Sequence, residues 1–201
     1  MLPVASTVPY PWPYDADAEL ELARFALVVA GAQQRWATLD QNGVGRRIEL
    51  LADRLRAGGG TVVFVRHARP PHGRPDSELP TRGSAAWELA MTPDAGDVVV
   101  DVAGHDAFLT GAVDLELRAR GCDHLLCVGF ASEALVDSTL RSANDRGYEC
   151  LTISDAVAPF DLEVGARALA SITMSGGIFG AVGTTAAVLE ALGVPAQRGA
   201  P

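Results

Sequence analysis

The sequence predicts an α/β fold, a three-layer α/β/α sandwich built around a mostly parallel sheet. Short apolar runs rich in valine and leucine alternate along the chain with longer segments whose apolar residues recur at helical spacing. Glycine directly follows several of the helical segments, where a left-handed residue commonly ends a helix. Strands that alternate with helices form βαβ units, in which the strands run parallel.

Five short apolar runs are the predicted strands. They cover residues 25–30, 61–66, 98–102, 125–130 and 150–154. The glycine-rich stretch 176–182 is predicted to be a short last strand or a loop. Because the intervening segments are helical, we expect helices on both faces of the sheet.

The segment 46–57 has the clearest helical pattern. It places Ile48, Leu51 and Leu55 at helical spacing and stops at three consecutive glycines, which predicts a crossover helix. Further helices are predicted at 115–120, 133–146, 162–175 and 185–192. In an open, Rossmann-like sheet of this kind, the ligand crevice lies outside the carboxyl ends of the strands.

The ends of the chain differ in composition from residues 25–193, which are predicted to form one domain. Residues 9–14 read PYPWPY, and this proline-aromatic pattern predicts that residues 1–24 form an extended arm lying on a surface. Residues 194–201 are predicted to be a flexible tail.

Composition restricts the function classes. A formal net charge of -9 argues against nucleic acid or an anionic membrane as a partner, because both would repel the surface. No apolar run approaches the roughly 20 residues needed to span a bilayer, and no leader pattern opens the chain. The three cysteines form no C-x-x-C pair. A reduced compartment is therefore expected, and the protein is predicted to be cytoplasmic.

Three blocks of sequence resemble the isochorismatase-like cysteine hydrolases, which include nicotinamidases and the ureidoacrylate and biuret amidohydrolases. The blocks are FALVVAGAQQ at 25–34, GDVVVDVAGHDAF at 96–108 and RARGCDHLLCVGFASEAL at 118–135. They occur in order at predicted strand ends, followed by DRGY at 145–148 and SDAVA at 154–158. The resemblance covers about residues 10–192. The proline-aromatic arm, the 67–80 loop and GGIFG at 176–180 are similar to the biuret and related amidohydrolases.

The resemblance implies that three catalytic positions have been vacated. In the family, a cysteine thiolate attacks an amide carbonyl, an aspartate moves the proton, and a lysine lowers the thiol pKa or orients the aspartate. At the matching positions this sequence has Leu135, Gly31 and Val102, respectively. None of these side chains ionises, so the resemblance implies that the family's reaction is lost.

Three functions follow as hypotheses. The first is an inactive structural or regulatory subunit in a homo- or hetero-oligomer, most plausibly beside an active relative. The second is a small-molecule sensor that uses the old crevice over an apolar floor. The third is an amide or other C–N hydrolase whose nucleophile has moved to Ser132, with His105 as its base. The candidate ligand contacts are Gln33, Arg66, Arg74, His105, Phe130 and Ser132.

Each of these candidates also has a structural interpretation. Ser132 is predicted to cap the following helix, and the arginines after the second strand are expected to be a solvated cluster. The cysteines, Cys122, Cys127 and Cys150, are expected in the core. No cofactor is predicted. His67, His72 and Asp76 share one loop, but their spacing does not match the metal ligands of nicotinamidases, so no metal is predicted either.

Overall fold

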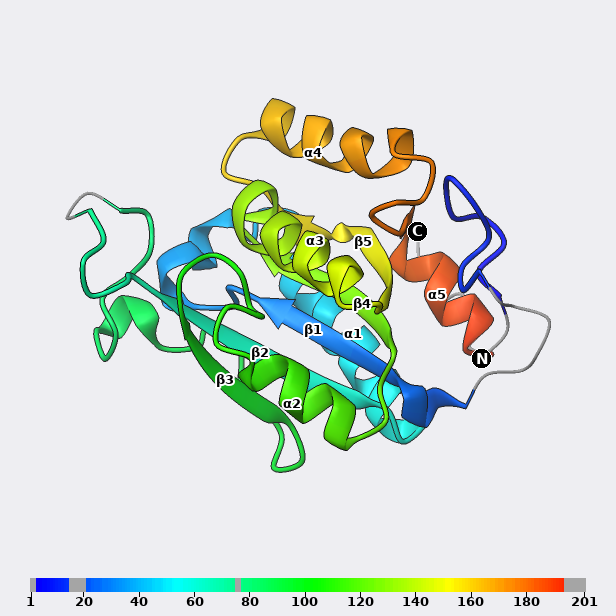
Figure 1. Cartoon of the computed structure of the whole chain (residues 1–201), viewed down its shortest axis with the longest axis horizontal. Helices are drawn as coiled ribbons and strands as arrows, with labels where there is room; N and C mark the ends of the chain where they lie inside the picture. The colour runs from blue at the N-terminus through cyan, green and yellow to red at the C-terminus, as the bar shows by residue number, and fades with distance from the viewer. Residues whose placement is uncertain (1–2, 15–20, 75–76, 194–201) are drawn as a thin grey trace, which may run out of the picture.

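A parallel β-sheet forms the centre of the molecule (Figure 1). The computed structural model describes residues 3–14, 21–74 and 77–193. Within them the sheet has six strands, and every neighbouring pair is parallel. The strands are β1 (Phe25–Ala30), β2 (Thr61–Ala68), β3 (Val98–Ala103), β4 (His124–Phe130), β5 (Glu149–Ala158) and β6 (Ala181–Gly183).

The strand order is β3-β2-β1-β4-β5-β6, so the direction of chain progress reverses between β1 and β4. The register pairs Ala30 with Gly129, which brings the carboxyl ends of β1 and β4 to the same edge of the sheet. Ligands of open parallel sheets bind outside the carboxyl ends of the strands at such a reversal. The segments that follow β1 and β4 therefore occupy the position where this fold places a site.

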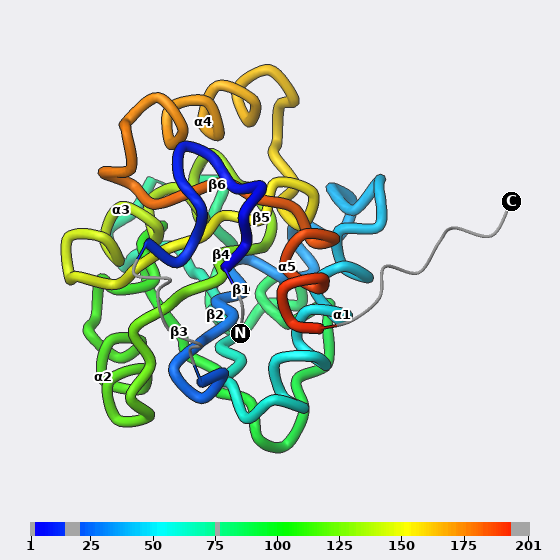
Figure 2. The backbone as a smooth tube through the Cα atoms, turned by 90° about the vertical axis from the view of Figure 1, so that its right-hand side faces the viewer, coloured from blue at the N-terminus to red at the C-terminus, as the bar shows by residue number. Residues whose placement is uncertain are grey.

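Helices cover both faces of the sheet. They are α1 (Val44–Ala57), α2 (Ala112–Ala119), α3 (Asp137–Asp145), α4 (Leu162–Met174) and α5 (Thr185–Ala191). Figure 2 shows α2 and α3 on one side of the sheet and α1 and α5 on the other, with α4 across the top. Short helical turns are η1 (Leu22–Arg24), η2 (Gln34–Leu39), η3 (Ala85–Trp87) and η4 (Ser132–Val136). In the part of the chain that the structure describes, no helix is long and apolar enough to cross a membrane.

The predicted α/β fold is confirmed, and the differences lie mostly at element ends. Helix α1 begins two residues before the predicted 46–57, because Asp40 accepts hydrogen bonds from the backbone N–H groups of Val44 (2.7 Å) and Gly45 (3.1 Å). A side-chain oxygen that satisfies free N–H groups at a helix start stabilises the first turn.

Strand β5 is longer than the predicted 150–154, because it continues to Ala158 beyond an irregularity in its pairing with β4. The polar pair Ser154 and Asp155 lies at this irregularity. The Ser154 hydroxyl donates to the Gly183 carbonyl, and Asp155 accepts hydrogen bonds from Thr185. Because neighbouring elements satisfy both polar side chains, they interrupt the ladder without ending the strand.

Residues 3–14 of the N-terminal segment pack against the domain. Val4 pairs with Trp12, and Val8 pairs with Val182 of β6, both antiparallel. The Trp12 ring is fully buried, 5.6 Å from the Phe25 ring between centroids. These contacts tie the described part of the predicted arm to the sheet. The predicted tail, 194–201, and residues 15–20 of the arm lie outside the described residues.

Candidate functional site

Gly31 directly follows β1 and adopts a left-handed conformation with φ of 68°. A side chain at this position would require its neighbours to shift. A Cβ built on Gly31 would lie 2.6 Å from Cδ1 of Leu135, 3.2 Å from the Phe130 carbonyl oxygen and 3.3 Å from Cε3 of Trp36. The positive φ and the crowding both favour glycine at this position.

Leu135 lies on the turn that follows β4. The chain leaves β4 through Ala131, a non-glycine residue with φ of 52°, and enters the π-helical turn η4. The Ala131 carbonyl accepts hydrogen bonds from the N–H groups of Ala134 (2.9 Å) and Leu135 (2.8 Å). Strained residues and π turns are common at functional sites. Here the turn directs a buried leucine side chain against Gly31.

Val102 lies near the carboxyl end of β3, beside His67 of β2 in the sheet register, and both side chains are buried. Nδ1 of His67 donates to the Gly104 carbonyl over 2.9 Å, while Nε2 has no partner among the described residues. Burial lowers the pKa of His67 to about 4, although the bond to Gly104 opposes this shift. At neutral pH the region around Val102 therefore holds an uncharged imidazole.

Gln33 is buried, and both its side-chain nitrogen and its side-chain oxygen form hydrogen bonds. Its amide donates to the carbonyls of His67 (3.1 Å) and Trp87 (2.7 Å), and its Oε1 accepts from the His67 N–H (2.7 Å). These bonds connect the segments after β1, after β2 and at η3. The structure thus gives Gln33 a role in positioning loops.

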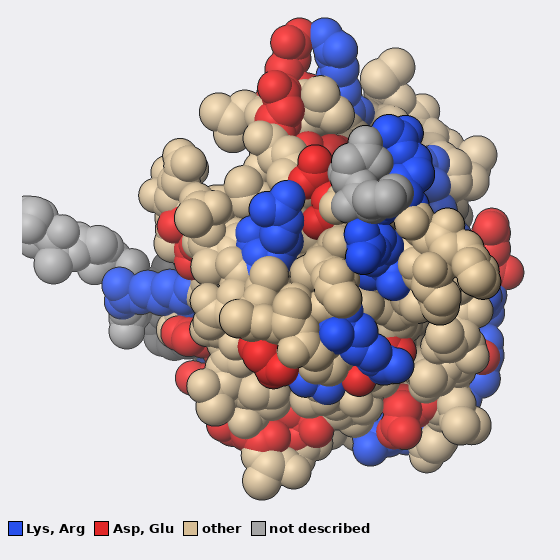
Figure 3. All heavy atoms as spheres, turned by 90° about the vertical axis from the view of Figure 1, so that its left-hand side faces the viewer, with Lys and Arg blue, Asp and Glu red and all other residues tan. Residues whose placement is uncertain are grey.

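Arg66, near the end of β2, and Arg82, in the segment that follows, both bind an acidic partner. Arg66 stacks 3.8 Å over the Trp87 ring and donates to Asp101 over 2.7 Å. Arg82 donates to the other oxygen of Asp101 over 2.8 Å. Figure 3, which faces the left-hand side of Figure 1, shows acidic and basic side chains interspersed over this surface. Arg74 is exposed on the 69–81 loop.

The candidates for a relocated nucleophile do not meet in one pocket. Ser132 is buried at the start of η4 and lines a cleft near β5, whereas His105 is exposed after β3 and is not among the residues lining that cleft. The prediction that Ser132 caps the helix is wrong. The residue at the cap position is Ala131, whose left-handed backbone starts the turn without a side-chain bond. Phe130 is buried at the end of β4.

The cysteines are core residues, as expected: Cys122, Cys127 and Cys150 are all free and buried. Burial raises the pKa of Cys150 well above its usual value, and the neighbouring Cys127 adds to the shift. Burial also raises the pKa of Cys122. A thiol nucleophile needs its thiolate form, which the environments of Cys122 and Cys150 disfavour.

The structure brings no metal-ligating cluster together within its described residues. Of the loop residues weighed as ligands, His67 is enclosed as above, His72 is exposed, and Asp76 lies outside the described residues.

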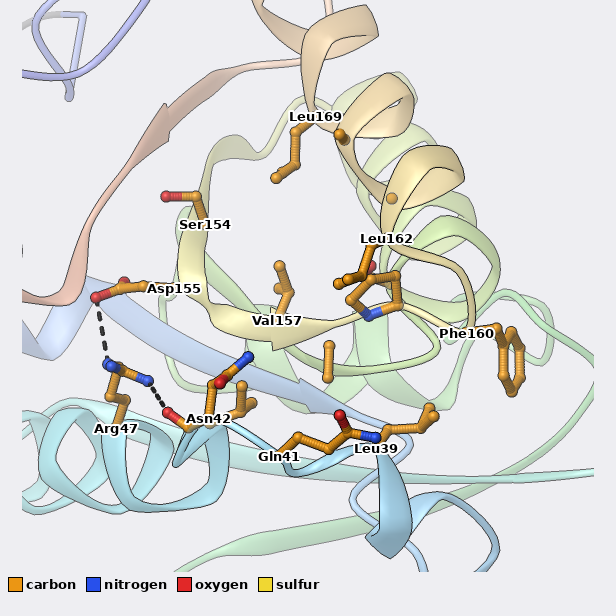
Figure 4. Close-up of a pocket in the computed structure, with 16 residues that line it drawn as sticks. Leu39, Gln41, Asn42, Arg47, Ser154, Asp155, Val157, Phe160, Leu162 and Leu169 are labelled. Atoms are coloured by element: carbon orange, nitrogen blue, oxygen red, sulfur yellow. Dashed lines mark hydrogen bonds and ion pairs between the residues drawn. The ribbon is translucent and has the colours of Figure 1, made fainter.

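A cavity lies at the carboxyl end of β5. We call it the β5 cleft; its lining residues come from 39–47, Ser132, 154–162 and 165–169, and its volume is about 450 Å³ (Figure 4). Glu133 helps to shape it, because its Oε1 accepts hydrogen bonds from the N–H groups of Phe160 (2.9 Å) and Asp161 (3.2 Å). These bonds hold the segment between β5 and α4 against the turn after β4.

Sequence reasoning missed two functional candidates in this cleft, Arg47 and Asp155. Little in the sequence distinguishes them. Arg47 is one of several arginines in a predicted helix, and Asp155 belongs to the SDAVA segment at the end of a predicted strand. Only the fold brings the start of α1 to the end of β5. The rule that crevices lie outside carboxyl strand ends indicates the correct edge of the sheet.

Comparison with known proteins gives consistent matches. The model of the isochorismatase domain matches residues 25–187. A Bacillus subtilis protein named "uncharacterized isochorismatase family protein YwoC" is 30% identical over 72% of this chain and 82% of its own length. A ureidoacrylate amidohydrolase of Methylobacterium radiotolerans is 36% identical over 61% of this chain, but the matched region spans only 47% of that enzyme.

Solved structures agree on the fold. A cysteine hydrolase from Pseudomonas syringae pv. phaseolicola superposes with a TM-score of 0.76 and 23% identity, covering 88% of this chain and 95% of that one. An isochorismatase family protein from Burkholderia thailandensis gives a TM-score of 0.72 and 28% identity, covering 86% of this chain and 97% of that one.

Proposed function

Because the chain belongs to the isochorismatase family, we propose that it is a member that has lost the family's cysteine-hydrolase reaction and acts as a structural or regulatory subunit. The observation that carries the proposal is the packing of Leu135 against Gly31, where Cδ1 occupies the space a Cβ would need. Leu135 therefore fills the space beside Gly31, and neither residue has an ionisable side chain.

The size of the expected loss follows from the roles of the missing groups. Removing one nucleophile or base from a catalytic unit lowers the rate by about 10⁴- to 10⁶-fold. Gly31, Val102 and Leu135 offer neither a nucleophile, a base nor a cation. An aspartate restored at position 31 would also collide with Leu135. This crowding beside Gly31 supports the proposal.

Helix α4 supports the subunit part of the proposal. It is rich in apolar residues, yet only Gly165 and Ile172 are buried. Met174 is 85% exposed at its end, and Ile178 in the following turn is 70% exposed. Large exposed apolar patches mark surfaces that a partner covers, and these exposed side chains are the candidates for such a surface. Relatives named as ureidoacrylate amidohydrolases favour an active amidohydrolase of the same family as that partner.

Native mass spectrometry of the protein purified gently from its own cells tests the proposal. The expected result is an assembly of fixed stoichiometry that contains a second family member with aspartate, lysine and cysteine at the three positions. A protein recovered only as a monomer or as a homo-oligomer contradicts it. Met174→Glu and Ile178→Glu should dissociate the assembly by burying a charge in an apolar contact. Leu115→Glu, at a 70% exposed position on α2, is the matched control and should leave it intact.

A further inference from the structure

The β5 cleft is large enough for a small molecule and is separate from the vacated positions. Its volume of about 450 Å³ lies within the range of ligand pockets, roughly 300–1,000 Å³. Among its described lining residues are none of Gly31, Val102 and Leu135. Its lining is therefore distinct from the three vacated positions.

One side of the cleft carries an ion pair. Nε of Arg47 lies 3.4 Å from Oδ2 of Asp155, and the two side chains are 36% and 35% exposed. Figure 4 shows both side chains at the same side of the cleft, Arg47 from α1 and Asp155 from β5. The pair is loose, because a close charge-assisted hydrogen bond measures about 2.7–2.9 Å.

Neighbouring groups hold both side chains in place, and each side chain keeps atoms that could form further hydrogen bonds. Oδ1 of Asp155 accepts hydrogen bonds from the N–H (2.8 Å) and hydroxyl (2.9 Å) of Thr185, which leaves Oδ2 with the 3.4 Å contact to Nε of Arg47. Nη1 of Arg47 donates to the Asn42 carbonyl over 2.6 Å. A guanidinium has five N–H groups, and the others of Arg47 have no hydrogen-bond partner among the described residues. An anionic oxygen and a cationic donor edge therefore lie side by side and accessible.

The rest of the cleft is apolar. Phe160 and Leu162 lie across from the ion pair, with Leu169 above and Val157 and Leu39 along the floor (Figure 4). Leu162 is 80% exposed although it lines a cavity. A ligand that covered these side chains would gain roughly 25 cal/mol for each Å² of apolar surface removed from water.

We propose that the β5 cleft binds a free α-amino acid with an apolar side chain. The α-carboxylate accepts hydrogen bonds from the unused N–H groups of Arg47, and the α-ammonium donates to Oδ2 of Asp155. The apolar side chain packs against Val157, Phe160 and Leu162. Both ligand charges thus meet an opposite charge, and the apolar end meets the apolar wall.

Ligands with one charge or none fit less well. A simple anion would face Asp155 and the protein's net charge of -9, and a simple cation would face the guanidinium of Arg47. A wholly apolar ligand would cover the ion pair and remove its hydrogen bonds to water. It offers no polar group to replace those bonds, so this burial is costly. Only a zwitterion of no net charge satisfies both members of the pair.

Isothermal titration calorimetry with the full chain tests the site. L-leucine and L-phenylalanine are titrated beside N-acetyl-L-leucine, which lacks the ammonium, and L-leucine amide, which lacks the carboxylate. We expect saturable binding of both amino acids and binding weakened at least about tenfold for each derivative, the loss of one charge-assisted bond. Equal binding of a derivative, or no heat from either amino acid, overturns the proposal.

Three variants check the residues. Arg47→Gln and Asp155→Asn should each weaken leucine binding about tenfold or more. Asp155→Asn keeps the oxygen that accepts from Thr185, so it tests the charge without removing that bond. Arg46→Gln is the matched control, because Arg46 is exposed on the neighbouring position of α1 and does not line the cleft. Weakening by Arg46→Gln equal to that by Arg47→Gln also overturns the assignment. Since the titration measures neither hydrolysis nor assembly, its outcome is independent of the function proposed above.

Discussion

Replacing Gly31 with alanine tests whether the side chain of Leu135 is packed against this position. The substitution has two costs. A left-handed backbone costs an L-residue roughly 1–2 kcal/mol. The new methyl group must also displace Cδ1 of Leu135, which lies 2.6 Å from its position. Overpacking of this kind costs about 1–3 kcal/mol, so Gly31→Ala should lower the free energy of unfolding by about 2–5 kcal/mol in total.

Gly43→Ala separates the two costs. Gly43 has nearly the same backbone conformation, with φ of 71°, but nothing lies within 4 Å of a Cβ built on it. Any change in the entropy of the unfolded chain is shared by both substitutions. Gly43→Ala should therefore cost only the backbone term, and the difference between the variants should be about 1–3 kcal/mol.

A double-mutant cycle then identifies Leu135 as the neighbour responsible. Leu135→Ala alone should cost about 2–5 kcal/mol through the cavity it leaves. In the double variant Gly31→Ala/Leu135→Ala, the new methyl group enters that cavity, so the combined loss should fall short of the sum by about 1–3 kcal/mol. Urea unfolding followed by circular dichroism measures all four proteins. Equal losses for Gly31→Ala and Gly43→Ala, or additive losses in the cycle, would show that Leu135 is not packed against position 31.

Three further predictions follow from buried side chains. Because the folded pKa of His67 is about 4, below its unfolded value of 6.5, the unfolded state takes up the proton first. The contribution of His67 to the free energy of unfolding is therefore complete above pH 6.5 and falls by about 3 kcal/mol as the pH drops to 4. The variant His67→Gln should show a smaller change in the free energy of unfolding between these pH values. The same pH dependence in the variant and the wild type would contradict this. Trp12→Ala should cost about 3–5 kcal/mol in urea unfolding, because the ring is fully buried, whereas Tyr14→Ala, at a 75% exposed position, should cost under about 1 kcal/mol; equal losses would show that the arm does not dock through Trp12. All three thiols should resist iodoacetamide in the folded protein and react in denaturant, as read by mass spectrometry, and rapid labelling of the native protein would disprove their burial.

The strands were predictable because their sequence pattern is local. β1 and β4 are buried along their whole length, and an uninterrupted apolar run such as 25–30 has few other stable positions in an α/β protein. The end of β5 was not predictable in this way. Its polar pair, Ser154 and Asp155, resembles a strand end, but contacts with Gly183 and Thr185 satisfy both side chains. Those contacts join segments about 30 residues apart, which no local pattern reveals.

The sequence nominates candidate site positions, but it does not predict how they are arranged. The family resemblance identifies Gly31, Val102 and Leu135 as the positions to inspect. It does not reveal that Leu135 fills the space beside Gly31, because that contact depends on the left-handed turn at Ala131. The β5 cleft was not predictable for a similar reason, because Arg47 and Asp155 come together only when α1 packs against β5.

The most direct test of the central claim is ammonia release by the purified chain, assayed at high protein concentration with a panel of primary amides and ureido compounds. We expect ammonia release no faster than in buffer, and no change with Ser132→Ala. Turnover that co-purifies with the chain and disappears in Ser132→Ala would contradict it, because a working nucleophile would then remain in the fold.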